Sequence, residues 1–158
     1  MGRVVTEDEL VHEMAAGARQ GLRFALANGH FDLLHVGHLR YLEAAAREAD
    51  RLIVAINDDG SVARLKGAGR PIVPAAERAE LLAALAPVDF VLIFDGDTPA
   101  PLLARLRPAV HCKGTDYGTP ERVPEYETVR GYGGMTRLVG DPKDHATSDL
   151  IAKIRSLP

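Results

Sequence analysis

The chain has 158 residues, a formal net charge of −3 and a pI near 6.1. This length suits a single domain whose core needs neither disulfides nor a structural metal. The lysines and arginines are scattered rather than gathered into a basic stripe, so we expect no nucleic-acid partner. The single cysteine, Cys112, excludes an internal disulfide and is expected to be a small core residue in a reducing compartment.

The N-terminal region is charged and amphipathic, and no later segment approaches the roughly 20 apolar residues that a membrane span requires. These features favour a cytoplasmic protein without a membrane partner. Thr6 and Glu9 have the spacing of a capping box, and Leu10 begins a run of apolar residues at helical intervals. This pattern predicts a helix over residues 7–19, within an extension of residues 1–22 that packs outside the main sheet.

Short apolar runs alternate with stretches of helical character along the rest of the chain. The runs predict strands at Arg23–Asn28, Leu52–Asn57, Phe90–Phe94, Val110–Lys113 and Thr136–Val139. The intervening stretches predict helices over about residues 37–48, 75–85, 99–106, 121–131 and 148–156, with a short one before Lys66. This alternation predicts an α/β fold, a doubly wound, five-stranded parallel sheet with helices on both faces.

Polar residues gather at the carboxyl ends of the predicted strands. The polar runs are Asn28–His38, Asn57–Gly60, Lys113–Tyr117 and Gly140–Thr147. Because open α/β sheets bind their ligands at that edge, we expect the active site to lie along these runs.

The most informative stretch runs from Asn28 to His38, between a predicted strand and an amphipathic helix. A helix N-terminus offers unpaired N–H groups and a positive dipole end, and Gly37 lets a phosphate approach the backbone closely. His35 and His38 are three residues apart, on one face of the first helical turn, from which both could contact one triphosphate.

The spacing alone leaves other interpretations open. The two histidines would also fit a solvated pair at a helix start, or one of them could be a hydrogen-bonded core histidine. His30, His35 and His38 would together fit a metal site, although no carboxylate-rich or Cys-rich group completes its ligand shell. The identity of any metal therefore stays unknown at this point.

The pattern NGxFDxxHxGH, which begins at Asn28, resembles the cytidylyltransferase-like nucleotidylyltransferase superfamily and its Rossmann-like fold. Within it, the chain is most similar to the family of adenylyltransferases that make ADP-heptose. The motifs that carry this resemblance are Asn28–Asp32, His35–His38, Ser61–Gly67, Arg70–Ile72, Glu77–Arg78, Asp97–Pro99 and Lys113–Tyr117. The resemblance assigns residues 23–158 to the nucleotidylyltransferase domain.

The resemblance also implies roles for particular residues. It makes His35, His38 and Lys66 catalytic, as groups that stabilise charge in the transition state. It implies a nucleotide-binding set of Gly29, His30, Phe31, Gly37, Lys113, Gly114, Asp116, Thr147 and Ser148.

Several of these residues have simpler explanations. Lys66 would also fit a solvated lysine, and Asp116 would also fit a turn cap. Thr147 or Ser148 would also fit a helix N-cap, and Arg78 would fit phosphate binding, the bracing of a loop or a solvated helix face.

Two features depart from the family pattern. Residues 141–145 replace the segment that contains an arginine in glycerol-phosphate cytidylyltransferases, which disfavours CTP and glycerol phosphate. Position 30 is His where related heptose enzymes often have a smaller residue, and its side chain either narrows the pocket or adds a phosphate donor.

The expected reaction transfers AMP from ATP to D-glycero-β-D-manno-heptose 1-phosphate and gives ADP-heptose and pyrophosphate. Mg²⁺ is expected with ATP, and Asp32 is the nearest carboxylate for it or for the substrate phosphate. The resemblance implies a homodimer or larger homo-oligomer. We expect a separate sugar kinase to supply the acceptor. Two alternatives stay open, a cytidylyltransferase for glycerol 3-phosphate or another small phosphorylated alcohol, and a nucleotide-binding regulatory module without turnover.

Overall fold

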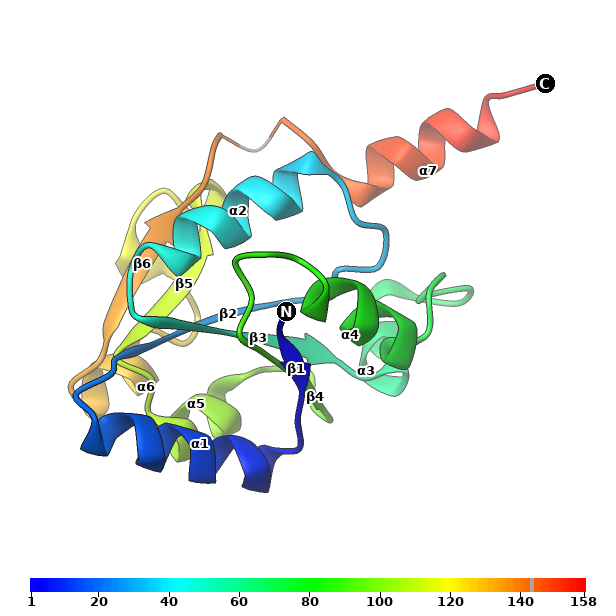
Figure 1. Ribbon diagram of the computed structural model, residues 1–158. Coiled ribbons are helices and arrows are strands. Elements are labelled where there is room, and N and C mark those ends of the chain that lie inside the picture. The colour runs from blue at the N-terminus through cyan, green and yellow to red at the C-terminus, as the bar shows by residue number, and fades with distance from the viewer. Residues whose placement is uncertain (143) are drawn as a thin grey trace.

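Six parallel strands form one sheet in the order β1-β4-β3-β2-β5-β6 in the computed structural model of the chain (Figure 1). The structure describes residues 1–142 and 144–158. The strands are β1 (Arg3–Val4), β2 (Phe24–Gly29), β3 (Arg51–Asn57), β4 (Phe90–Phe94), β5 (Val110–Gly114) and β6 (Met135–Val139). Because parallel neighbours require crossover connections, helices follow the strands and cover both faces of the sheet.

Helices lie on both sides of the sheet, and the last helix extends away from it toward the C-terminus (Figure 1). They are α1 (Glu7–Arg19), α2 (Val36–Ala46), α3 (Asp59–Lys66), α4 (Ala75–Ala83), α5 (Ala100–Leu106), α6 (Tyr126–Gly131) and α7 (Thr147–Arg155). Helices α2 and α4 contribute to one buried cluster, and α1, α5 and α6 contribute to the other. The predicted doubly wound arrangement is confirmed.

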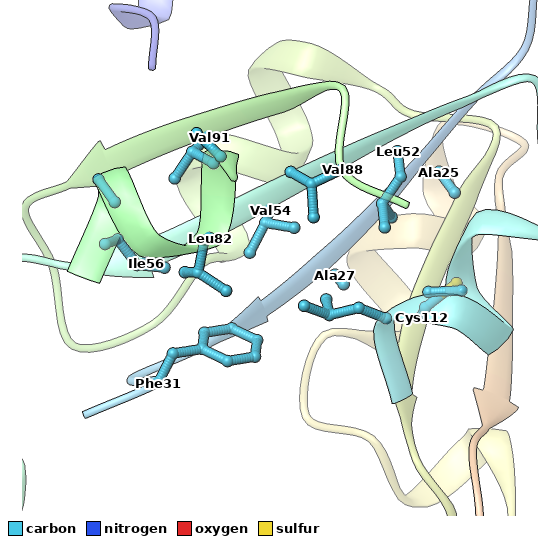
Figure 2. Close-up of a cluster of buried hydrophobic side chains, with 14 of the residues drawn as sticks. Ala25, Ala27, Phe31, Leu52, Val54, Ile56, Leu82, Val88, Val91 and Cys112 are labelled. Carbon is cyan, nitrogen blue, oxygen red and sulfur yellow. The ribbon is translucent and has the colours of Figure 1, made fainter. Parts of the chain in front are cut away.

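Alternate residues of the central strands fill the two clusters. Ala25 and Ala27 of β2 face the same side as Val54 of β3 and Leu82 of α4, whereas Leu26 of β2 faces the opposite side. Figure 2 shows the first of these clusters, in which the Phe31 ring closes one end. Cys112 is buried in it, as expected, and burial raises the pKa of its thiol to about 12.

The sheet has six strands rather than the predicted five. The additional strand, β1, pairs with β4 through Arg3 opposite Phe90 and Val4 opposite Val91. Both of its residues are exposed and the strand has only two residues, so it leaves no periodic signal in the sequence.

Two predicted helices have different bounds. The helix predicted over 121–131 begins only at Tyr126, because a 3₁₀ turn at Pro120–Arg122 and then Pro124 interrupt the segment. Lys66 is the last residue of α3 rather than a residue of the following loop, and Gly67, with φ of 93°, ends the helix.

The prediction that residues 1–22 pack outside the main sheet is wrong, because this segment contributes a strand to the sheet and side chains to the core. The predicted capping box of α1 is present, because the Glu9 N–H donates to Thr6 Oγ1 at 3.3 Å and the Thr6 N–H donates to Glu9 Oε2 at 2.7 Å. Leu10 of α1 is fully buried in the cluster that contains Phe24 and Phe90. In the part of the chain that the structure describes, no helix is long and apolar enough to span a membrane.

Replacing Leu10 with Ala should lower the free energy of unfolding by about 2–5 kcal/mol, because it leaves a cavity under α1. Leu81→Ala is the matched control, since Leu81 is 52% exposed on α4 and its loss should change stability by less than about 0.5 kcal/mol. Urea unfolding of the two variants measures the difference. Equal stability of both variants would show that α1 is not part of the cooperative core.

Candidate active site

A pocket of about 410 Å³ opens at the carboxyl edge of the sheet. It lies beside the ends of β2 and β5, which are neighbours in the sheet but whose following helices, α2 and α6, cover opposite faces. Such a change of side leaves a crevice between strand ends, which is where α/β sheets bind ligands. Three of the four predicted polar runs contribute to its walls, and the exception is Asn57–Gly60.

The pocket brings together nearly all the predicted site residues. The catalytic candidates His35, His38 and Lys66 line it, as does Asp32. The nucleotide-binding candidates that line it are Gly29, His30, Phe31, Gly37, Lys113, Gly114, Asp116, Thr147 and Ser148. Arg78 is not among the lining residues.

Two helix N-termini open on this pocket. The first turns of α2 and α7 lie side by side in Figure 1, and Thr147 Oγ1 donates to the Leu33 carbonyl at 3.4 Å. Among the described residues, neither N-cap residue, His35 or Ala146, makes a side-chain capping hydrogen bond. The His38 and Asp149 N–H groups donate to the carbonyls of His35 and Ala146 at 2.9 and 3.1 Å, so the N–H groups of the first two residues of each helix are the ones available to an anion.

Two stacked imidazoles form one wall of the pocket. The ring centroids of His35 and His38 are 3.8 Å apart with an interplanar angle of 20°, and the Phe31 ring lies 5.0 Å from that of His38. Burial lowers the pKa of His35, and repulsion from His145 lowers it further, while Asp149 opposes the shift. The lowered pKa favours the neutral form of His35, in which the ring contributes hydrogen bonding rather than a full charge.

Gly37 and Gly114 lie in close contacts at the pocket wall. A Cβ on Gly37 would lie 3.0 Å from His35 Nδ1 and 3.1 Å from His145 Cβ, so a side chain there would displace one of these neighbours. A Cβ on Gly114 would lie 2.6 Å from Asp116 Oδ1, so the Asp116 side chain would have to move. Glycine at both positions keeps the backbone accessible to a bound phosphate.

His30 lines the pocket in its neutral form. Burial lowers its pKa to about 4, and the nearby positive charges of Lys66, Arg78 and Arg70 contribute to the shift. The ring thus narrows the pocket without adding positive charge.

Asp32 is buried and organises the loop after α3. Its carboxylate accepts hydrogen bonds from Arg70 Nε at 2.6 Å and from the N–H groups of Ile72 and Val73 at 2.8 and 2.9 Å. Burial alone would raise the pKa of Asp32, but these three donors outweigh it and lower the pKa. Asp32 thereby holds Arg70 at the pocket wall. The roles predicted from the sequence did not include Arg70.

Arg78 lies behind the pocket and is fully buried. Its guanidinium donates to the carbonyls of Val73, His30 and Asn57 at 2.8, 2.7 and 3.0 Å, and to Asp59 Oδ1 at 2.8 Å. Four of its five N–H donors are thus used within the fold. This arrangement suits the bracing role, one of the alternatives that the sequence left open.

The cationic side chains of the pocket come from different segments. Lys66 ends α3 with an exposed side chain, and Lys113 Nζ lies 5.3 Å from the centroid of the Tyr117 ring. Both lysines line the pocket, and the exposed Lys66 still fits a solvated lysine as well as a phosphate ligand. Ala146, rather than Thr147 or Ser148, is the N-cap of α7.

The sequence reasoning missed His111, which is fully buried on β5. Its Nε2 lies 2.9 Å from Oδ1 of Asn28, the first residue of the motif, and so donates to it. Burial lowers the pKa of His111 to about 3, and Lys113 contributes, so the ring is neutral and fixes the orientation of the Asn28 amide. His111 and Asn28 meet only because β2 pairs with β5. No local sequence pattern indicates that pairing.

Among the residues that the structure describes, no group of three or more His, Cys, Asp or Glu side chains could hold a metal ion. The Asp32 carboxylate already accepts three hydrogen bonds. The described residues around the pocket therefore suit a hard cation whose ligands are substrate phosphates and water rather than protein side chains.

These features define a domain of the doubly wound α/β class, whose pocket lies at a change of strand order and presents helix N-termini and cationic side chains suited to phosphate groups. Residues 26–149, more than half of the chain, match the family model described as cytidylyltransferase-like. The chain therefore belongs to the cytidylyltransferase-like family.

Curated relatives include two proteins named bifunctional protein HldE. That of Geotalea uraniireducens (strain Rf4) is 50% identical over 149 residues, which are 94% of this chain and 30% of the relative. That of Alkalilimnicola ehrlichii is 46% identical over 155 residues, 98% of this chain and 32% of the relative. The chain thus spans about a third of the length of these relatives.

A solved structure shares the fold. The crystal structure of the lipopolysaccharide core biosynthesis protein from Thermoplasma volcanium GSS1 superposes with a TM-score of 0.64 and 25% identity, over 77% of this chain and all of that one.

The buried His111 should make the protein less stable in acid. The unfolded chain binds a proton at this residue below about pH 6.5, whereas the folded protein binds it only near pH 3. The neutral His111 therefore makes its full contribution to the free energy of unfolding above pH 6.5. This contribution is lost as the pH falls, by up to about 1.4 kcal/mol per pH unit. Urea unfolding of His111→Leu between pH 7.5 and 5 should show a correspondingly smaller loss than the wild type.

The control for this measurement is His12→Leu, because His12 is an exposed residue of α1. That variant should retain the pH dependence of the wild type. An unchanged slope in His111→Leu would contradict the assignment.

Proposed function

We propose that the chain transfers AMP from ATP to D-glycero-β-D-manno-heptose 1-phosphate and releases pyrophosphate. The observation that carries the proposal is the meeting of two helix N-termini, the His35 and His38 pair and Lys66 at one pocket. These groups complement a triphosphate. The identity with the HldE relatives and the motifs shared with the ADP-heptose enzymes support the choice of substrates.

In the proposed reaction, a phosphate oxygen of the sugar 1-phosphate attacks the α-phosphorus of ATP in line. A new oxygen–phosphorus bond forms, the bond between the α-phosphorus and the bridging oxygen breaks, and pyrophosphate leaves with that electron pair. A phosphate nucleophile is already ionised near neutral pH, so no general base is needed.

The protein then acts by alignment and by charge stabilisation. His35 and His38 would donate hydrogen bonds to the phosphates from the first turn of α2, and Lys66 would approach from the end of α3. Lys113, Gly114 and Asp116 would border the nucleotide at the end of β5. Mg²⁺ would enter with ATP and neutralise phosphate oxygens when bound.

The remaining parts of the proposal concern the setting of the reaction. We propose a cytoplasmic enzyme that assembles as a homodimer or larger homo-oligomer and receives its acceptor from a sugar kinase. Its product would serve lipopolysaccharide biosynthesis, a route that the description of the Thermoplasma volcanium structure also names. Sedimentation velocity tests the assembly state.

Pyrophosphate release by the purified protein tests the reaction. ATP and CTP are each combined with Mg²⁺ and with either heptose 1-phosphate or glycerol 3-phosphate. We expect release only with ATP and the heptose. Release only with CTP and glycerol phosphate would replace the substrates within the same family, and nucleotide binding without release would favour a regulatory module.

His38→Ala should lower kcat by about two to three orders of magnitude, because it removes a donor to the transition state. The control is His12→Ala, which changes an exposed histidine of α1. Steady-state pyrophosphate release measures both, and thermal unfolding verifies that both variants fold. Near-normal turnover of folded His38→Ala would exclude the catalytic assignment.

A further inference from the structure

The chain just before α7 passes over the first turn of α2. Asp141 is held from two sides, because its carboxylate pairs with Arg40 Nη1 at 3.2 Å and its carbonyl accepts from Thr115 Oγ1 at 3.0 Å. At the other end of this crossing, Thr147 Oγ1 donates to the Leu33 carbonyl at 3.4 Å. Contacts at Asp141 and Thr147 thus hold the described residues of this crossing segment, Asp141, Pro142 and Asp144–Thr147, beside the pocket.

His145 lies in the crossing segment and faces the two histidines of α2. Its Cβ would be 3.1 Å from a Cβ on Gly37, and its ring centroid is 6.3 Å from that of His35 with an interplanar angle of 24°. His35 is thus the ring nearest to both others, since it also stacks on His38 at 3.8 Å, and all three imidazoles line the pocket. They lie beside the N-termini of α2 and α7.

The neighbouring carboxylate selects the hydrogen-bonding form of His145. Nδ1 of His145 lies 2.5 Å from Oδ1 of Asp144, and this hydrogen bond lowers the pKa of Asp144. Since a carboxylate only accepts, the proton is on Nδ1 and Nε2 is the ring atom left for a ligand. When the ring carries both protons, its Nε2–H is the remaining donor and can bind an anion.

We propose that His145 is a third imidazole of the triphosphate site, which binds the β- or γ-phosphate, and that Asp144 is its positioning residue. The proposal rests on the proposed function only in that the ligand is a nucleoside triphosphate. The His145 ring lies between the N-termini of α2 and α7, and this position favours phosphate oxygens over a sugar ring as its ligand. The side chain of His145 is 40% exposed, so its ring is accessible to a ligand without rearrangement of the core.

Binding of nucleotides without the acceptor tests this role. Isothermal titration with Mg²⁺ compares ATP with AMP, and CTP with CMP, for the wild type, His145→Ala and the control His12→Ala. We expect the Kd of the triphosphate to rise about tenfold in His145→Ala while the Kd of the monophosphate changes less than about twofold. Equal weakening of both nucleotides, or no weakening of the triphosphate, would overturn the proposal.

A double-mutant cycle tests the part played by Asp144. Asp144→Asn should weaken triphosphate binding about threefold to fivefold in the wild-type background and should have no further effect in His145→Ala. A purely structural role would instead weaken the monophosphate equally or persist without His145. Thermal unfolding confirms that each variant is folded.

The design separates the failure of this inference from the failure of the proposed reaction. The CTP and CMP titrations keep the test valid if the donor base is not adenine. Selective loss of triphosphate binding without turnover of heptose 1-phosphate would support His145 and refute only the acceptor. A wild type that binds triphosphate no more tightly than monophosphate would overturn the inference itself.

Discussion

One buried guanidinium holds together the frame on which the pocket is built. Arg78 donates hydrogen bonds to four groups. They are the carbonyls of His30 just after β2, of Asn57 at the end of β3 and of Val73, and the carboxylate of Asp59 at the start of α3. A buried charge is costly unless its donors are satisfied, and here four of them are. These four partners belong to four different segments of the chain. The hydrogen bonds that satisfy the buried guanidinium therefore also fix the positions of these segments relative to one another.

Asp32 complements Arg78 from the pocket side. It accepts from Arg70 and from the N–H groups of Ile72 and Val73, while Arg78 bonds the carbonyl of Val73. The segment after α3 is thus held by two charged residues. Asp32 binds the N–H groups of Ile72 and Val73, and Arg78 binds the carbonyl of Val73. The contacts of these two charged residues, which the motif resemblance associates with the substrate phosphate, therefore lie within the fold, and one of them holds Arg70 at the pocket border.

The sequence predicted much of this site because its signals are local. The periodic apolar runs gave five of the six strands, and the motif from Asn28 to His38 marked the strand-to-helix turn at the switch point. What it could not predict depends on pairing between distant segments. The exposed edge strand β1 has no apolar pattern, and the contact of His111 with Asn28 exists only because β5 lies beside β2. Likewise, nothing near His145 in the sequence indicates that its ring faces His35 across the first turn of α2.

The protonation states of the histidines bear on how the pocket would attract a triphosphate. Burial lowers the pKa of His30 to about 4 and also lowers that of His35, so neither ring supplies a full positive charge at neutral pH. The attraction must then come from Lys66, Arg70 and Lys113 together with the two helix N-termini. A neutral imidazole in a fixed position still donates one hydrogen bond, and the stacked His35 and His38 rings hold each other in place along the pocket wall. A pocket built in this way holds its histidines in contact before the phosphates arrive, and leaves the long-range attraction to the lysines, the arginine and the helix N-termini.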